Sequence, residues 1–244
     1  MKKKIFITGS GSGLGLNLAQ KLKNKDYDVI VNVRSEKDKS KLLKYFEVKN
    51  IIVADLNIEK DLINASKYIK KNFRTIDVLI CNAGGNIKNN SNSLSAWSKI
   101  IDKNFWTTVN SVLNFEKFIN KNGKIICISS ICGKEYIDGA PTNYSVAKSA
   151  VNAFVKFYSH HTSISNKTIN AIMPGNLMFK GSVWDKKIKK NKKNVKDYIK
   201  KNVPSNQFGN IESIIDMINY IINQKDNFLN GSLLTLDGGQ TKSL

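Results

Sequence analysis

Short runs of apolar residues alternate with longer amphipathic segments along the whole chain. The runs are nearly continuous, which is typical of strands that are buried on both faces of a sheet. Seven are expected as strands: Lys4–Thr8, Asp28–Val33, Ile51–Ala54, Val78–Cys81, Lys124–Ile128, Thr168–Ile172 and Ser232–Leu236. Helical periodicity lies between them, at about 13–25, 36–46, 58–72, 95–120, 142–163 and 210–223. This alternation predicts an α/β fold in a single domain, residues 1–244, with a doubly wound parallel sheet of about seven strands and helices on both faces.

One segment, residues 177–208, interrupts the alternation between the sixth strand and the last helix. It contains Trp184 and a lysine-rich helical stretch, and it ends near Val203-Pro204-Ser205. An insertion of this length in a compact domain is more often a lid or a binding loop than a plain connector. We therefore expect a substrate lid at about 177–208. Two roles are open for Trp184, which either packs against a bound sugar or acyl chain or anchors the lid to the core.

A glycine-rich run follows the first predicted strand directly. It reads Thr8-Gly9-Ser10-Gly11-Ser12-Gly13-Leu14-Gly15, and a helix is expected to follow. Glycines allow the backbone to approach a pyrophosphate, and the start of a helix offers free N–H groups to phosphates. The alternative is an ordinary flexible turn, but the position after the first strand of a strand–helix–strand unit favours a dinucleotide site.

The end of the second predicted strand bears on the choice of cofactor. It reads Asn32-Val33-Arg34-Ser35, without the acidic residue that would bind the ribose 2′-hydroxyl of NAD. Arg34 can pair with the 2′-phosphate of NADP instead. It is one of only two arginines in a chain with 37 lysines, although a solvated surface side chain is the alternative. We expect NADP(H) in preference to NAD(H).

Two further strand ends carry residues suited to a nucleotide. Asp55 follows the third strand, where its carboxylate can accept a hydrogen bond from an adenine amine or cap the next helix. The sequence Cys81-Asn82-Ala83-Gly84-Gly85 follows the fourth strand. Small side chains at that position let a cofactor lie against the strand ends, although an ordinary strand-to-helix turn would also accommodate them.

Tyr144 and Lys148 form a pattern that is suited to acid–base catalysis. They are four residues apart in a predicted helix and therefore share one face. The lysine ammonium would lower the pKa of the phenol from about 10, and the phenol could then exchange a proton with a carbonyl or alcohol oxygen. Such pairs also arise by chance. Two other residues strengthen the interpretation. Ser130 ends the fifth strand, and Asn104 is a poor mid-helix residue that could bend its helix around a water, although compositional bias in a chain with 31 Asn is the alternative.

In combination, these motifs resemble those of the short-chain dehydrogenase/reductase family, over essentially the whole chain. The matching residues are Thr8-Gly9, Gly13, Gly15, Asp55, Asn82-Ala83-Gly84, Asn104, Ser130, Tyr144, Lys148, Pro174-Gly175 and Leu236-Asp237-Gly238-Gly239. The resemblance implies a Rossmann-type sheet, a nicotinamide cofactor and a homodimer or homotetramer built through the long helices and the last strand. It also implies four catalytic roles: Tyr144 as general acid/base, Lys148 on the nicotinamide ribose, Ser130 on the carbonyl and Asn104 in a proton relay.

The resemblance also implies which residues meet the cofactor. They are Gly9, Ser10, Ser12, Gly13, Leu14, Gly15, Arg34, Ser35, Asp55, Leu56, Asn82, Ala83, Gly84, Tyr144, Lys148, Pro174, Gly175 and Leu177. Two positions depart from the family pattern: Cys81 stands where many members have Asn, and Phe179 where many have a Thr beside the carboxamide. The segment 174–184 is similar to a subgroup of 3-oxoacyl-carrier-protein reductase-like proteins, some of which act in surface-sugar and nonulosonate pathways.

The net charge of +20 changes this picture only locally. The chain has 31 Asn and many Lys but two Arg, which fits a compositional bias better than a nucleic-acid surface, where Arg is preferred. The lid is the exception, because residues 180–201 hold ten Lys and two Asp. We hypothesise that the lid attracts an anionic carbonyl substrate, sugar-derived or carrier-linked. A solvated helix face is the alternative.

Together these features predict an NADP(H)-dependent oxidoreductase that interconverts a ketone and a secondary alcohol. The alternative is a catalytically silent regulator or nucleic-acid-binding protein on the same fold, and the charge is its only support. No apolar run is long enough to cross a membrane, and the one near the basic start is too short for a signal peptide. Cys81, Cys127 and Cys132 are too few and wrongly spaced for a zinc site or a disulfide framework. We expect no metal, no nucleic-acid partner and a cytoplasmic location.

Overall fold

A parallel sheet of seven strands forms the centre of the protein, in the order β3-β2-β1-β4-β5-β6-β7. The computed structural model describes residues 2–87 and 91–243. The strands are β1 (Lys4–Ile7), β2 (Asp28–Val33), β3 (Ile51–Val53), β4 (Ile76–Cys81), β5 (Ile119–Ile128), β6 (Thr168–Pro174) and β7 (Leu233–Leu236). Each neighbouring pair is parallel. The predicted α/β fold with a doubly wound sheet is confirmed.

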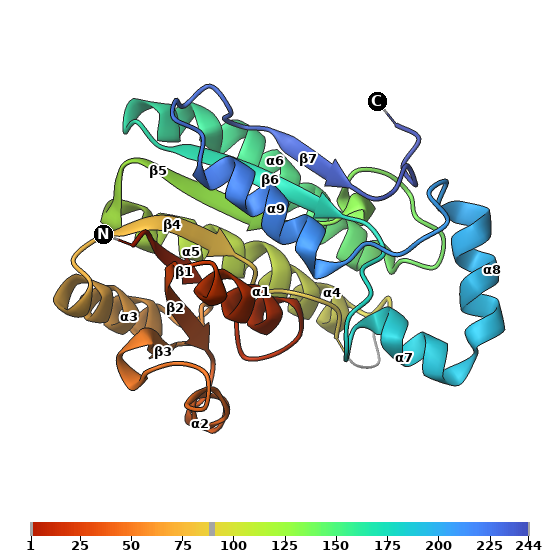
Figure 1. Cartoon of the computed structure of the whole chain (residues 1–244), viewed down its shortest axis with the longest axis horizontal. Helices are drawn as coiled ribbons and strands as arrows, with labels where there is room; N and C mark the ends of the chain where they lie inside the picture. The colour runs from red at the N-terminus through yellow and green to blue at the C-terminus, as the bar shows by residue number, and fades with distance from the viewer. Residues whose placement is uncertain (1, 88–90, 244) are drawn as a thin grey trace.

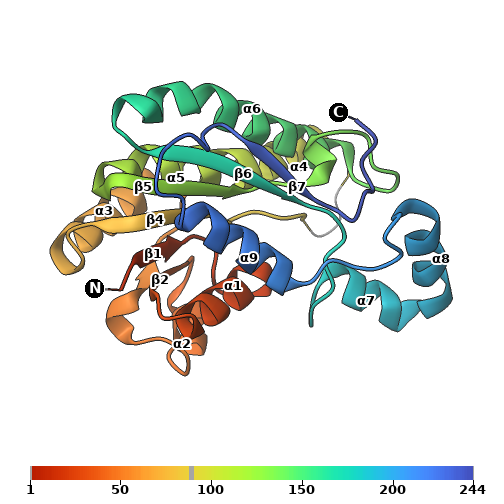
Figure 2. The ribbon, with the colours of Figure 1, turned by 45° about the horizontal axis from the view of Figure 1, so that its top comes forward.

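Helices cover both faces of this sheet (Figures 1 and 2). They are α1 (Gly13–Asn24), α2 (Glu36–Leu42), α3 (Glu59–Asn72), α4 (Leu94–Ile101), α5 (Thr107–Phe115), α6 (Thr142–Ile164), α7 (Val183–Lys190), α8 (Lys192–Asn202) and α9 (Ile211–Ile222). Leu18 of α1 and Ile218 of α9 belong to one core cluster. Leu62 of α3, Phe115 of α5 and Val155 of α6 belong to the other. The two clusters lie on opposite faces because side chains alternate along each strand.

Three predicted boundaries are wrong. The helix expected at 95–120 is divided by a π-helical turn, Asp102–Trp106, and ends in a short 3-10 turn, Glu116–Phe118. The helix expected at 36–46 stops at Leu42. Strand β5 begins at Ile119 rather than Lys124, and its early part was not recognised because residues 120–122 are polar and not buried. Short 3-10 turns also occur at Val48–Asn50 and Ile131–Gly133.

The predicted lid segment forms the two helices α7 and α8, which project from one end of the sheet (Figure 1). These helices pack mainly on each other. Within the parts of the chain that the structure describes, no helix is both long and apolar enough to cross a membrane.

Candidate active site

The side chains selected from the sequence come together at one edge of the sheet. Strands β1, β4, β5 and β6 are neighbours, so the segments that follow their carboxyl ends lie side by side. Those segments hold the glycine-rich run, the turn after β4, Ser130 and the pair Pro174-Gly175. Helix α6 brings Lys148 to the same place, since a Cβ atom on Gly84 would lie 3.5 Å from its Nζ atom.

The glycine-rich run requires glycine at the two positions where it meets the turn after β4. Gly9 has φ of +64°, and a Cβ atom there would lie 2.6 Å from the Cα atom of Ala83. A Cβ atom on Gly15 would overlap the side-chain amide of Asn82 and the carbonyl oxygen of Gly9. Any larger residue would therefore push the two segments apart and move the start of α1.

The start of α1 is suited to a phosphate group. The first N–H groups of a helix have no partner within the helix, and its dipole is positive at this end. Ser12 occupies the N-cap without a side-chain capping bond, and the first turn of α1 has no acidic residue. Ser10, by contrast, is fully buried and its hydroxyl donates to the carbonyl of Ile7 (2.6 Å), so its side chain faces the interior. Only the backbone of Ser10 is left for the predicted cofactor contact.

Side-chain hydrogen bonds hold this loop in position, and one of the residues involved was not expected from the sequence. The Oδ1 atom of Asn32, in β2, accepts from the N–H of Gly9 (3.2 Å), and its Nδ2 atom donates to the carbonyl of Ala54 (3.1 Å). The only signal in the sequence is a polar residue within an otherwise apolar strand. Asn82 donates to the carbonyls of Thr8 (3.1 Å) and Gly9 (3.2 Å), so it ties β4 to the loop.

Arg34 follows the end of β2, and its side chain is exposed. Lys103 donates from its Nζ atom to the carbonyl of Asn86 (2.7 Å). Burial lowers the pKa of Lys103, and the positive charge of Arg34 lowers it further. The hydroxyl of Ser35 donates to the carboxylate of Asp38 (2.9 Å). Hydrogen bonds from Lys41 and Ser35 hold the pKa of that carboxyl below its ordinary value.

Asp55 and Leu56 follow β3 on the same edge. The carboxylate of Asp55 accepts from the N–H of Asn57 (3.0 Å), while the N-cap of α3 is Ile58. The alternative role of Asp55 as a helix cap is therefore wrong. Leu56 is buried in the core, so only its backbone is placed to meet a ligand.

Asn104 sits in the middle of the π-helical turn and is fully buried. Its Oδ1 atom accepts from the N–H of Gly85 (2.8 Å), and its Nδ2 atom donates to the carbonyls of Gly85 (3.1 Å) and Ile100 (3.0 Å). Its side chain thus competes for a backbone carbonyl of its own helix, as expected where a helix widens. A Cβ atom on Gly84 would lie 2.8 Å from Oδ1, so glycine is required for this close approach.

Lys148 is buried and Tyr144 is half-buried on one face of α6, and neither pKa shifts in the direction that their expected coupling predicts. The Nζ atom of Lys148 donates to the carbonyl of Ile128 (2.9 Å) and lies 5.9 Å from the centre of the Tyr144 ring. Burial raises the pKa of Tyr144, and the nearby Cys132 adds to this, while a hydrogen bond with Ser130 opposes it. Burial also lowers the pKa of Lys148 to about 8. The expected lowering of the Tyr144 pKa by Lys148 is therefore wrong for this structure, because burial has the largest effect on this pKa.

Comparison with known proteins shows which family this arrangement belongs to. The family model described as enoyl-(acyl carrier protein) reductase matches residues 9–241. The chain belongs to the short-chain dehydrogenase/reductase family. It is similar to the 3-oxoacyl-acyl-carrier-protein reductase FabG of Chlamydia muridarum, with 30% identity over 191 residues that cover 74% of this chain and 72% of the relative. It is also similar to FabG of Buchnera aphidicola, with 27% identity over 223 residues that cover 84% and 83%.

Solved structures agree with this assignment. ElxO with NADP bound is 26% identical, with a TM-score of 0.84, and the match covers 98% of this chain and 99% of that one. A gluconate 5-dehydrogenase from Burkholderia cenocepacia, in complex with NADP and tartrate, has the same fold at 22% identity and a TM-score of 0.85, covering 100% and 97%. The chain is therefore an NAD(P)-dependent oxidoreductase that acts on CH–OH or C=O groups.

In this short-chain dehydrogenase/reductase, the predicted lid segment, 177–208, begins shortly after the carboxyl end of β6. The side chains of Leu177 and Phe179 pack against the core cluster that includes residues of α1 and α9. Phe179, which lacks the hydroxyl that many family members have here, is thus held by apolar contacts. A Cβ atom on Gly175 would lie 2.8 Å from the Cα atom of Asp237, so this glycine lets the lid entry pass close to the end of β7.

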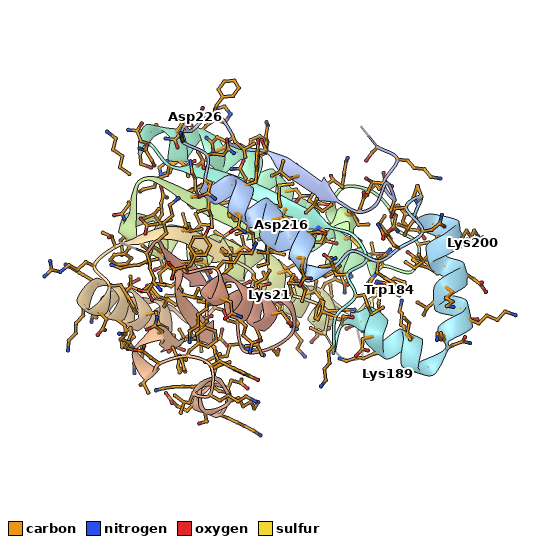
Figure 3. The ribbon with its side chains drawn as sticks, in the orientation of Figure 1. Lys21, Trp184, Lys189, Lys200, Asp216 and Asp226 are labelled. Atoms are coloured by element: carbon orange, nitrogen blue, oxygen red, sulfur yellow. The ribbon has the colours of Figure 1, made fainter. Side chains whose placement is uncertain are left out.

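Trp184 packs on aromatic side chains within the lid segment itself. Its ring lies 4.8 Å from that of Tyr198 in α8 and 5.5 Å from that of Phe208. Figure 3 shows Trp184 facing the body of the protein, whereas Lys189 and Lys200 project from the lid. A groove of about 300 Å³ lies between the lid helices and is lined by Trp184, Lys187, Lys190, Asn191, Asn194, Val195 and Tyr198.

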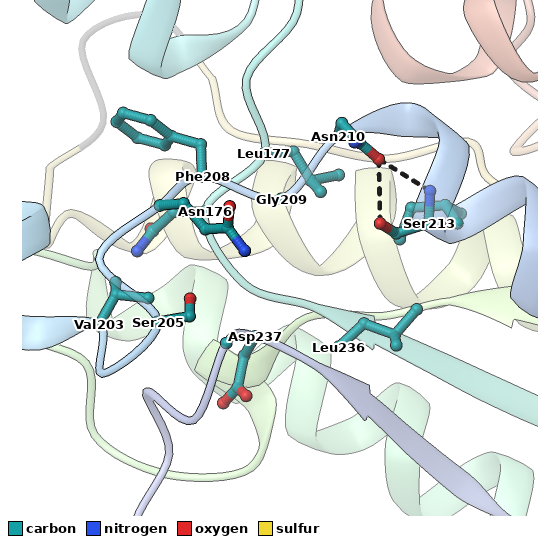
Figure 4. Close-up of a pocket in the computed structure, with 13 residues that line it drawn as sticks. Asn176, Leu177, Val203, Ser205, Phe208, Gly209, Asn210, Ser213, Leu236 and Asp237 are labelled. Atoms are coloured by element: carbon teal, nitrogen blue, oxygen red, sulfur yellow. Dashed lines mark hydrogen bonds between the residues drawn. The ribbon is translucent and has the colours of Figure 1, made fainter.

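A pocket of about 200 Å³ lies at the base of the lid (Figure 4). Asn176 and Ser205, from the two ends of the lid segment, line it together with Asp237, which follows β7. Within the described part of the chain, no cluster of three or more His, Cys, Asp or Glu residues could hold a metal ion.

Proposed function

We propose that the protein interconverts a ketone and a secondary alcohol with NADP(H), and that Tyr144 is the general acid/base. The observation that supports this most directly is the meeting of Ser130, Tyr144, Lys148 and Asn104 beside a loop shaped for a dinucleotide. The glycines at positions 9 and 15 and the uncapped start of α1 fit such a cofactor. When bound, it would supply a hydride to the carbonyl carbon or accept one from the alcohol.

Each of the four residues then has a distinct task. Tyr144 donates its phenolic proton to the carbonyl oxygen during reduction and removes a proton from the hydroxyl during oxidation. Ser130 holds the same oxygen beside the phenol. Lys148 binds the ribose next to the nicotinamide. Asn104 fixes the turn after β4 and supports the return of a proton to Tyr144.

The decisive experiment follows NADPH oxidation with a panel of keto-sugars, sugar nucleotides and β-ketoacyl thioesters, in parallel with NADH. Turnover with at least one ketone would exclude the alternative of a catalytically silent regulator or nucleic-acid-binding protein. Strong retention on heparin without any turnover would favour that alternative. The variant that tests the mechanism itself is Tyr144→Phe.

Arg34 is proposed to select NADP(H) over NAD(H), because its exposed side chain directly follows the end of β2. A charge-assisted hydrogen bond to a phosphate contributes about 1.5–3 kcal/mol. Replacement of Arg34 by Gln should therefore raise the KM for NADPH about tenfold or more and leave the KM for NADH unchanged. Lys37→Gln, an exposed charge change on α2, is the matched control. Equal effects on both cofactors would contradict the proposal.

The lid is proposed to attract an anionic substrate. Lys187 and Lys190 line the groove between the lid helices, and no acidic side chain lies within ion-pair distance of either among the described residues. A variant with four substitutions, Lys187→Gln, Lys190→Gln, Lys193→Gln and Lys200→Gln, should raise the KM for acetoacetyl-CoA severalfold and weaken its dependence on salt. The KM for a neutral ketone should stay constant.

A variant with the same change in net charge separates the lid from the overall charge. Helix α3 carries four exposed lysines, Lys60, Lys67, Lys70 and Lys71, on the other side of the molecule. Their replacement by Gln should leave the KM for acetoacetyl-CoA unchanged. If both fourfold variants shift the KM equally, the lid has no special role and its lysines form a solvated face.

We also propose that the chain, 1–244, forms one domain. The protein would assemble in the cytoplasm as a homodimer or homotetramer, through its long helices and its last strand. Large apolar side chains are exposed on these elements: Leu113 on α5, Phe157 and Ile164 on α6, and Leu233 on β7. The three cysteines are free, which suits a reducing compartment. Light scattering should give at least twice the mass of one chain, and a mass of 27.4 kDa would contradict the proposal.

A further inference from the structure

The segment that follows β7 turns sharply and is held by its own carboxylate. Gly238 and Gly239 have φ values of +67° and +84°. Asp237 accepts hydrogen bonds from the N–H groups of Gly239 (2.9 Å) and Thr241 (2.7 Å). These bonds fix the direction in which the C-terminal tail leaves the sheet. Figures 1 and 2 show this tail running past the loop that precedes α6, at the end of the molecule that carries the lid.

The tail contacts the lid at its entry, at its exit and on its second helix. The buried side chain of Gln240 accepts from the Nδ2 atom of Asn176 at the entry (2.6 Å) and donates to the hydroxyl of Tyr198 in α8 (3.2 Å). The carbonyl of Gly238 accepts from the N–H of Ser205 at the exit (3.0 Å). Tyr198 in turn packs on Trp184 of α7, so the bond from Gln240 reaches the aromatic contact that joins the two lid helices.

Two residues further on, the tail contacts the loop between Ser130 and Tyr144. The carboxylate of Glu135 accepts from the N–H groups of Lys242 (2.9 Å) and Ser243 (2.7 Å). One segment of seven residues, 237–243, therefore connects both ends of the lid to the loop that carries the proposed catalytic serine. These bonds therefore add to the apolar contacts of Leu177 and Phe179 that hold the lid in place.

We propose that residues 237–243 are a strap that sets the gap between the lid and the loop 130–144, with Gln240 and Glu135 as positioning residues. A substrate that enters beneath the lid must fit between these two segments. The strap orders that space before binding, so its loss weakens substrate binding more than the chemical step. The consequence for the KM rests on the proposed function, whereas the consequence for lid mobility does not.

Limited digestion with trypsin measures lid mobility directly, because residues 180–201 contain ten lysines. Loss of the two side-chain bonds of Gln240 in Gln240→Ala should speed cleavage within 180–201 about fivefold to tenfold. Gln224→Ala is the matched control, because Gln224 makes a local bond to the carbonyl of Tyr220 (3.0 Å) far from the lid. Cleavage in this control should match that of the wild type.

Glu135 provides a second, more exposed test if Gln240→Ala folds poorly. Glu135→Ala should speed lid cleavage, whereas Glu135→Gln keeps an acceptor oxygen and should restore most of the protection. Since both residues act through one strap, the double variant Gln240→Ala/Glu135→Ala should exceed neither single variant by much. Full additivity would overturn the single strap.

Kinetics then test the positioning role. Gln240→Ala and Glu135→Ala should raise the KM for acetoacetyl-CoA about fivefold or more and leave kcat within about twofold. Faster cleavage with an unchanged KM would overturn the positioning role, and unchanged cleavage would overturn the strap itself. If the wild type reduces no carbonyl compound, the proposed function fails, while the digestion experiment still decides whether the strap holds the lid.

Discussion

Tyr144→Phe is expected to lower the rate of NADPH-dependent ketone reduction by about 10³-fold or more, while the protein still folds and binds NADPH. Phenylalanine keeps the aromatic ring in α6 but removes the only group proposed to exchange a proton with the substrate oxygen. The reaction would then depend on a proton from solvent, without a positioned acid. Steady-state turnover gives the rate, and quenching of tryptophan fluorescence by NADPH gives cofactor binding.

Tyr136→Phe is the matched control for this substitution. Tyr136 lies on the same loop as Ser130 but is 84% exposed, and its hydroxyl has no proposed role. It should retain wild-type turnover. Turnover above about a tenth of the wild-type rate in Tyr144→Phe would refute Tyr144 as the general acid/base, provided that the variant binds NADPH normally.

Apart from the polar start of β5, the sheet could be predicted because its strands are short apolar runs, as burial on both faces requires. In β1, Ile5 and Ile7 belong to one core cluster and Phe6 between them belongs to the other. The edge that holds the candidate site could be predicted from the same logic, since parallel strands place all their carboxyl ends together. Even the bend at Asn104 was foreseeable, because an asparagine within a helix needs a partner for its side chain.

What could not be predicted depends on contacts between distant segments. Asn32 can hold the glycine-rich loop only because the ends of β1 and β3 place Gly9 and Ala54 within hydrogen-bond distance of its amide. Gln240 and Glu135 are 105 residues apart in the chain and act through a turn after β7 that no local pattern shows. The pKa of Tyr144 was predicted in the wrong direction because spacing along a helix tells nothing of desolvation.

Lys148→Met is expected to lower kcat/KM about 10²-fold or more and, at the same time, to stabilise the protein. Burial lowers the pKa of Lys148 from 10.5 to about 8, so at pH 7 the folded protein holds a charge at a cost of about 3 kcal/mol. Methionine has a similar length and no charge, although it loses the bond to the carbonyl of Ile128. A net gain of about 2 kcal/mol should raise the Tm by roughly 5 °C at pH 7.

The pH dependence of this gain in stability follows from the lowered pKa of Lys148. Between pH 8 and 10.5, the unfolded wild type binds a proton at Lys148 that the folded protein has released, so wild-type stability rises with pH in this window. The methionine variant has no such proton, and the stability gap should be full below pH 8 and close toward pH 10.5. Urea denaturation at pH 7, 9 and 10 measures the gap. Lys156→Met, on an exposed face of α6, should show no comparable dependence. If the difference in unfolding free energy between Lys148→Met and the wild type is absent at pH 7, or widens with pH, the buried ammonium is not a source of instability.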